Sequence, residues 1–225
     1  MKKRYGLLVD IDYCVGCGIC VIACKMENGL APSYKNMLEA KGVSWNQVIS
    51  VSDGIYPNLS IYTVPSHCNH CKDAPCIPSC PKEAIYKRMD GITLIAKDKC
   101  NACEDQPGQI KLCMPACPYG AIQFNEKQKV AEVCTFCVHR VEVGQEPACV
   151  RACLGRCLTF GDFNDPKSEV SLKAKKAGKR LFVFQAEKKT HPAVKYIAPK
   201  GAGISLLAKV KPIYGYGSEF AKPTM

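Results

Sequence analysis

Sixteen of the seventeen cysteines in this chain fall into four sets that share one spacing pattern. Each set opens with a CxxC pair and closes with a CxxxC pair, and the gap between the pairs lengthens from set to set. In chain order the sets are Cys14, Cys17, Cys20 and Cys24; Cys68, Cys71, Cys76 and Cys80; Cys100, Cys103, Cys113 and Cys117; and Cys134, Cys137, Cys149 and Cys153. Cys157 stands outside the pattern, and we expect it to be a buried or tolerated thiol.

The spacing indicates which chemistry these thiols perform. A CxxC pair lets two thiolates of one turn reach the same metal centre. A CxxxC pair places its cysteines about one helical turn apart, so its two sulfurs can serve different centres. In two-cluster ferredoxins three cysteines of a motif bind one iron–sulfur cluster and the fourth binds the other. Four copies of this pattern therefore predict iron–sulfur clusters.

Zinc and disulfides are the competing interpretations of so many cysteines. CxxC pairs also occur in zinc ribbons, and His67 and His70 flank the second set, but a zinc ribbon does not call for repeated CxxxC pairs. An odd cysteine count in a chain of 225 residues argues against a disulfide scaffold. We expect the four histidines to be neighbours of the clusters or surface groups rather than ligands; they are His67, His70, His139 and His191.

The formal net charge of +11 raises the question of nucleic-acid binding. Four [4Fe–4S] clusters with their thiolates would carry about −8, so we expect most of the positive excess to compensate them and predict no nucleic-acid partner. The sequence shows no apolar run near the roughly 20 residues that a membrane span needs. It begins without a signal-peptide pattern, so we expect the protein in the cytoplasm, or exported by association with a signal-bearing partner.

The segment between the second and third sets indicates how the sets pair. After Cys80 come a proline, an apolar strand, an Asp90-Gly91 turn, a second strand and then Cys100. This order is that of a two-cluster ferredoxin, so sets two and three should form one unit. Sets one and four, at the two ends of the cysteine-rich region, should form the other.

These pairings predict four ligand groups, named here site 1 to site 4. Site 1 consists of Cys14, Cys17, Cys20 and Cys153; site 2 of Cys24, Cys134, Cys137 and Cys149; site 3 of Cys68, Cys71, Cys76 and Cys117; and site 4 of Cys80, Cys100, Cys103 and Cys113. The expected fold is α+β, with two interleaved two-cluster ferredoxin-like units, an inserted segment and a C-terminal extension. The first unit covers residues 1–24 and 118–165, the insertion 25–67, the second unit 68–117 and the extension 166–225.

Segments around the cysteines resemble one known family. The motifs are VDIDYCVGCGICVIAC at residues 9–24, PSHCNHCKDAPC at 65–76, ACPYG at 116–120, CTFCVHR at 134–140, PACVRAC at 147–153 and GDFNDP at 161–166. They are similar to the four-cluster iron–sulfur (beta) subunits of the molybdopterin oxidoreductases, whose relatives serve dimethyl sulfoxide, polysulfide, tetrathionate and arsenate reductases and pyrogallol transhydroxylase. The resemblance covers roughly residues 4 to 170.

The resemblance implies an electron-transfer subunit that is not itself catalytic. Its partner would be a large molybdenum- or tungsten-pterin subunit nearest site 1, and a membrane anchor or soluble electron carrier would be a second partner. Some relatives replace a cysteine of the third set by tryptophan, but Cys103 is present here, so the resemblance implies four [4Fe–4S] clusters. A free-standing polyferredoxin and a zinc-organised interaction protein remain the alternatives.

Outside the sets the sequence predicts few elements. We expect a short helix over 33–40, a strand over 55–64, a helix over 166–178 that starts at a proline and ends at a glycine, and strands over 180–185 and 194–198. Trp45 should serve packing, and the lysines at 173, 175, 176 and 179 should form a solvated helix face. The loop Glu104–Leu112 should shield its cluster or contact a partner, and the tail after 200 should bind a partner.

Overall fold

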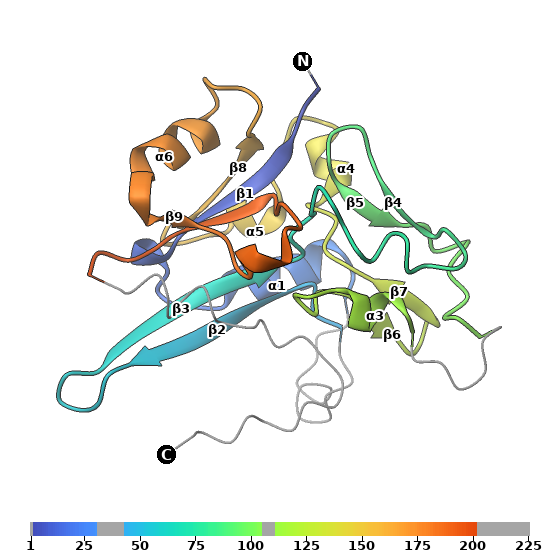
Figure 1. Cartoon of the computed structure of the whole chain (residues 1–225), viewed down its shortest axis with the longest axis horizontal. Coiled ribbons are helices and arrows are strands. Elements are labelled where there is room, and N and C mark those ends of the chain that lie inside the picture. The colour runs from blue at the N-terminus through green and yellow to red at the C-terminus, as the bar shows by residue number, and fades with distance from the viewer. Residues whose placement is uncertain (1, 31–42, 105–110, 202–225) are drawn as a thin grey trace.

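The computed structural model describes residues 2–30, 43–104 and 111–201. It is a mixed structure of short helices and small β-sheets, which agrees with the expected α+β class (Figure 1). The predicted helix over 33–40, most of the loop 104–112 and nearly all of the predicted tail lie outside the described residues. Among those that are described, no helix is both long and apolar enough to cross a membrane.

A four-stranded sheet joins the two ends of the described chain. Its order is β8 (Leu158–Asp162), β1 (Tyr5–Asp10), β10 (Val194–Ile197) and β9 (Leu181–Phe182). β1 is antiparallel to β8 and parallel to β10, and its residues 6–9 are all buried. The apolar run after the basic N-terminus is thus a central strand of this sheet. The predicted C-terminal strands pair within the same sheet.

Helices cover the sheet and carry several of the cysteines. α1 (Ile19–Glu27) packs with α5 (Ala148–Arg151), so the closing cysteines of the first and fourth sets come together. α6 (Glu169–Ala177) packs through Val170 and Ala174 against β1 and β8. Ser168 caps its N-terminus and Gly178 its C-terminus, so the predicted helix begins three residues later than expected.

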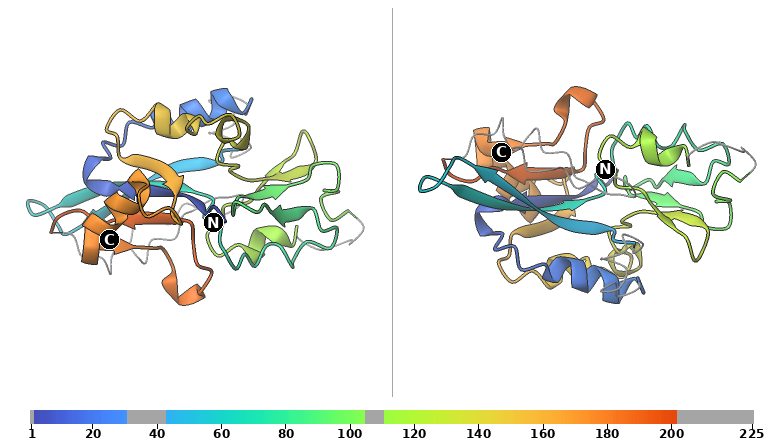
Figure 2. Two further views of the ribbon diagram at one scale, coloured as in Figure 1. Left: turned by 90° about the horizontal axis from the view of Figure 1, so that it is seen from above. Right: turned by 90° about the horizontal axis from the view of Figure 1, so that it is seen from below.

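Two short hairpins lie together on one side of the molecule (Figure 2). β4 (Ile85–Lys87) pairs with β5 (Thr93–Ile95) across the Asp90-Gly91 turn, as the sequence predicted. β6 (Gln123–Asn125) pairs with β7 (Val130–Glu132) across the polar turn that follows the third set. The remaining short elements are η1 (Ile11–Tyr13), α3 (Cys113–Ala116), α4 (Val138–Val141), η2 (Gly178–Arg180) and η3 (Ala186–Lys188).

A longer hairpin projects from the body of the protein (Figure 1). It consists of β2 (Asn46–Asp53) and β3 (Ser60–His67), paired antiparallel along their whole length. The sequence predicted one strand over 55–64, but the segment 54–59 forms the turn and the strand extends to His67. Pro57 and Asn58 within the predicted strand favour such a turn. The strand β2 was missed.

Candidate iron–sulfur cluster sites

The four CxxC pairs form turns of the same local shape. The third residue of each CxxC motif, just before its second cysteine, has a positive φ. The values are 69° at Gly16, 40° at His70, 58° at Ala102 and 51° at Phe136. This conformation is uncommon for residues other than glycine, and it persists where the surrounding structure requires it. Such turns point successive backbone N–H groups into a concave surface that favours negative charge. The repeated CxxC spacing therefore corresponds to a repeated anion-favouring turn.

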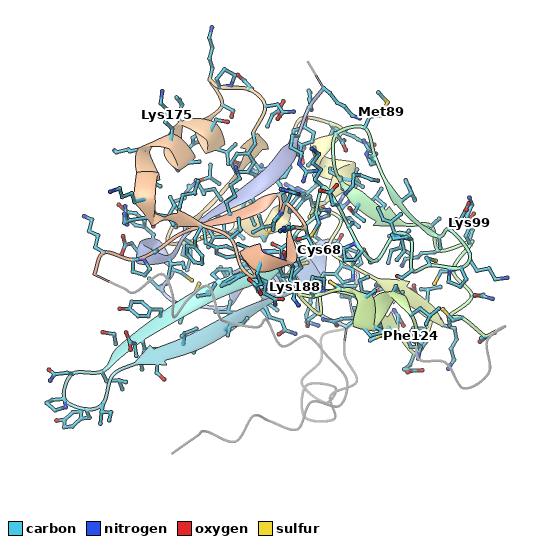
Figure 3. The ribbon with its side chains drawn as sticks, viewed as in Figure 1. Cys68, Met89, Lys99, Phe124, Lys175 and Lys188 are labelled. Atoms are coloured by element: carbon cyan, nitrogen blue, oxygen red, sulfur yellow. The ribbon has the colours of Figure 1, made fainter. Side chains whose placement is uncertain are left out.

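Site 3 surrounds a mainly apolar cavity. All four predicted thiols line it, together with the apolar side chains of Ile85, Ile95, Ile122 and Val133. Burial raises the pKa of Cys68 far above its ordinary value, and the nearby charge of Cys117 adds to the shift. Figure 3 places Cys68 near the middle of the molecule. The first three cysteines of the second set and the last cysteine of the third set therefore meet around one cavity.

Site 4 surrounds a second cavity, which is also lined by its four predicted thiols. Phe124, labelled in Figure 3, lines the same cavity. The backbone N–H of Ala84 donates to Cys80 Sγ at 3.3 Å, and that of Ala131 donates to Cys100 Sγ at 3.4 Å. Backbone donors of this kind stabilise thiolates, which are the form of cysteine that binds metal.

Sites 1 and 2 show the exchange of cysteines between the first and fourth sets. The pKa of Cys20 is raised to about 11, first by burial and then by the thiolates of its predicted partners Cys14, Cys153 and Cys17. The pKa of Cys134 is raised well above its ordinary value, first by burial and then by its predicted partners Cys24, Cys149 and Cys137. Asn28 Nδ2 lies 3.7 Å from Cys24 Sγ and 4.0 Å from Cys137 Sγ, so one amide can serve two thiols of site 2.

The structure places Cys157 beside site 1, which the sequence did not predict. Its Sγ lies 3.4 Å from Cys153 Sγ, and its thiol also forms a hydrogen bond with Cys14. The pKa of Cys14 is lowered to about 6, and this contact is the largest cause. The leftover thiol is therefore buried, as expected, but it contacts two of the four cysteines of site 1. Its only sequence signal is its position four residues after Cys153.

The interior around the second set carries polar groups that fit an inorganic cluster. Asn69 is almost fully buried and lines the cavity of site 3, and its side-chain amide has no hydrogen-bond partner among the described residues. His70 accepts from the backbone N–H of Thr93 through Nδ1 at 3.0 Å, which leaves the proton on Nε2. That Nε2 is buried and likewise lacks a partner within the described part of the chain. Sulfides of a cluster are acceptors that such donors require.

The thiols within each predicted site are spread around it rather than drawn together at one point. Within residues 2–30, 43–104 and 111–201, no three histidine, cysteine or acidic side chains converge closely enough to hold a single metal ion. The thiols of sites 3 and 4 instead line two mainly apolar cavities, with four thiols around each. His139 pairs with Glu27 and His191 with Asp73, both at 2.7 Å. The residues present thus fit [4Fe–4S] clusters, which are held by cysteine thiolates.

Cationic side chains lie close to the predicted ligands. Lys87 is partly buried beside site 3, where its Nζ donates to the backbone oxygen of Cys71 and to Thr93 Oγ1. Arg4 is also near Cys71, and the charge of this cysteine counteracts the lowering of the Arg4 pKa by burial. Lys25 is buried next to Cys24, and its Nζ donates to the Val43 oxygen at 2.8 Å. Positive charges placed in this way compensate negatively charged cluster sites.

The fold and the grouped thiols define a ferredoxin-like protein with several cluster sites. A family model described as "4Fe-4S dicluster domain" matches residues 59–163, which contain the second, third and fourth sets. A subunit of the tetrathionate reductase of Salmonella typhimurium is 32% identical over 94% of this chain and 79% of its own length.

Two further relatives carry similar names. The arsenate respiratory reductase iron-sulfur subunit of a Shewanella species is 32% identical over 75% of this chain and 86% of its own length. A subunit of the sulfite dehydrogenase of Allochromatium vinosum is 38% identical over 86% of this chain and 82% of its own length. The chain belongs to this family of iron–sulfur subunits of oxidoreductase complexes, which confirms the family predicted from the cysteine motifs.

Proposed function

We propose that this chain is a non-catalytic electron-transfer subunit that holds four [4Fe–4S] clusters. The observation that carries the proposal is the gathering of the cysteines into four groups, each with three thiols from one set and one from another. When bound, [4Fe–4S] clusters supply reversible one-electron transfer at potentials that the protein tunes. The ligands would be the sixteen cysteines of sites 1 to 4.

The exchange of thiols supports two interleaved ferredoxin-like units. One unit would comprise residues 1–24 and 118–165 with sites 1 and 2, and the other residues 68–117 with sites 3 and 4. The pairing of β1 with β8 and the packing of α1 with α5 join the first and last segments of the former. The insertion 25–67 and the extension 166–225 complete the chain.

Electrostatic effects between cysteines of different sites support a linear order from site 1 to site 4. Among the thiolates that raise the pKa of Cys149 in site 2, after burial and its own group, is Cys20 of site 1. Cys134 of site 2 acts in the same way on Cys68 of site 3. Cys76 of site 3 acts likewise on Cys113 of site 4, whose pKa is raised to about 12 chiefly by burial. An electron-transfer chain needs such neighbouring sites.

The partner implied by the relatives is a catalytic subunit, since their names describe subunits of reductases and a dehydrogenase. We propose that it is a large molybdopterin protein with molybdenum or tungsten, nearest site 1. A membrane anchor or a soluble electron carrier would exchange electrons at the other end. The complex would work in the cytoplasm, or outside it if the partner carries the export signal.

Metal analysis of anaerobically purified protein tests the proposal. We expect a brown protein with about sixteen iron and sixteen acid-labile sulfide per chain, four of each for every site. A colourless preparation with zinc in place of iron would support a zinc-organised interaction protein instead. Gel filtration of native extract separates the remaining alternatives: elution with a molybdenum or tungsten protein supports the proposed subunit, and elution alone at 24.6 kDa supports a free-standing polyferredoxin.

A further inference from the structure

The outer half of the β2–β3 hairpin, residues 52–61, is named here the arm. Every residue of the arm is exposed. Four of them are large and apolar: Ile55 is 84% exposed, Tyr56 86%, Leu59 45% and Ile61 64%. In Figure 1 the arm extends away from the rest of the molecule. A two-stranded ribbon that buries none of these side chains gains little stability from them in water.

The turn of the arm has a defined shape. The backbone N–H of Asn58 donates to the oxygen of Ile55 at 2.8 Å, and Gly54 has a φ of 86°. A side chain at Gly54 would lie 2.2 Å from the Asn58 oxygen, so a glycine is required for this turn to close. The apolar side chains are thus presented on a closed turn rather than on a chain end.

The base of the arm is tied to site 1. Thr63 Oγ1 donates to the backbone oxygen of Cys14 at 2.8 Å. Gly16 lies so close to Thr63 that an added side chain would meet its methyl group at 2.9 Å. On the same loop Tyr13 and Val15 are exposed apolar side chains, and Cys17 of site 1 is exposed too. The strand that carries the arm therefore contacts the loop of the most exposed cysteine of the four sites.

The charge of the arm indicates the kind of partner. Asp53 is the one charged residue of the arm. The arm therefore lacks the positive charge of the chain as a whole, which has 31 basic and 20 acidic residues. A surface for nucleic acid or an anionic membrane would carry lysine and arginine, whereas a neutral apolar arm fits an apolar protein surface. A protein that exchanges electrons at site 1 must lie against the Cys17 loop, and it would then meet the arm.

We propose that the arm packs against an apolar surface of the catalytic subunit and anchors it over site 1. This inference rests on the proposed function and adds the contact that fixes the partner. Electron transfer requires only that the partner approach site 1, while the arm supplies buried apolar area away from the thiols. Apolar and aromatic side chains at the centre of an interface commonly dominate its affinity.

Removing the apolar side chains of the arm tests the proposal. The test variant carries Ile55→Ser, Tyr56→Ser and Leu59→Ser in the tagged chain, expressed in its native host and purified as the complex. A matched control carries Met89→Ser, Val143→Ser and Leu172→Ser, three exposed apolar residues outside the arm. Met89 is labelled in Figure 3 on the opposite side of the molecule from the arm. Iron and molybdenum or tungsten are measured per tagged chain.

We expect iron at the wild-type level in both variants, and molybdenum or tungsten at the wild-type level in the control. The arm variant should lose about tenfold or more of the molybdenum or tungsten, as expected when central apolar contacts are removed. Retention of the metal by the arm variant, or an equal loss in the control, would overturn the role of the arm. So would a change from dimer to monomer caused by the arm variant in the isolated chain, because the arm would then bind a second copy.

The same measurements separate this inference from the proposed function. Wild-type protein with sixteen iron and its pterin metal, paired with an arm variant that keeps both, contradicts the arm alone. Wild-type protein that lacks iron, or that has iron but no molybdenum or tungsten, contradicts the proposed function and the assignment of the arm with it.

Discussion

At the scale of single residues, the thiol of Cys157 shows how the chain can adjust one site without supplying a ligand to it. If Cys14 and Cys153 bind a cluster as thiolates, Cys157 is the only one of these three cysteines that keeps its S–H proton. Its S–H then donates to a ligand sulfur at 3.4 Å. Hydrogen bonds to ligand sulfurs stabilise the more negative, reduced state, so they raise the reduction potential.

We therefore expect Cys157→Ala to lower the midpoint potential of a single cluster. The shift should be on the order of 20–40 mV, because a hydrogen bond of this kind contributes roughly 0.5–1 kcal/mol to the difference between redox states. Potentiometric titration followed by electron paramagnetic resonance resolves the clusters. Cys157→Ser keeps a donor and should restore most of the shift. Unchanged potentials in the alanine variant would exclude this role, as would a shift common to all clusters.

Lys87 is the second residue for which the site predicts a redox effect. Its ammonium lies beside Cys71, Cys68 and Cys76, and it donates to the Cys71 backbone. Removing a positive charge disfavours the reduced cluster, so Lys87→Met should make the potential at site 3 more negative by tens of millivolts. The same titration measures it, with Lys175→Met on the exposed face of α6 as control. A change no larger than that of the control would show that solvent screens the charge of Lys87.

At the scale of elements, the sequence predicted the parts that obey local rules. The β4–β5 hairpin followed from Asp90-Gly91, and α6 followed from the proline shortly before it and the glycine at its end. The hairpin β2–β3 was only half predicted, because exposed strands outside the core lack the strict alternation of buried and exposed positions that marks a half-buried strand. The contact of Cys157 with Cys14 could not be predicted, since it depends on how β1 pairs with β8, far along the chain.

The caps of α6 lead to a prediction about stability. Ser168 Oγ accepts from the backbone N–H of Ser171 at 3.3 Å, which satisfies one free donor of the first turn. Ser168→Ala should cost about 1 kcal/mol and lower the apparent Tm of the cluster-loaded protein by about 2–4 °C. Circular dichroism at a fixed heating rate measures it. Lys175→Ala, which is exposed in the same helix, should leave Tm unchanged. Equal Tm values for Ser168→Ala and wild type would show that the cap contributes nothing.

At the scale of the whole molecule, two of the three apolar core clusters among the described residues contain cysteines. One core cluster contains Cys20, Cys24, Cys134 and Cys149 together with residues of β1 and β10. Another contains Cys113 and surrounds the cavity of site 4 with residues of both short hairpins. In these two clusters, apolar side chains of separate elements pack together with the thiols. The chain is therefore expected to depend on its metal for tertiary structure, much as small metal-binding domains do.

Removal of iron tests this dependence directly. Left-handed backbone turns at His70, Ala102 and Phe136 cost conformational free energy, and so does the unpaired buried amide of Asn69. Without clusters, no bound group offsets this free energy. Treatment with an oxidant and a chelator should therefore abolish the near-ultraviolet circular dichroism and expose the chain to rapid trypsin cleavage. The β1–β8–β10 core contains apolar residues away from the thiols, so part of the far-ultraviolet signal should remain. A chelated protein that resists trypsin as the loaded protein does would show that the sheets and helices pack without their metal.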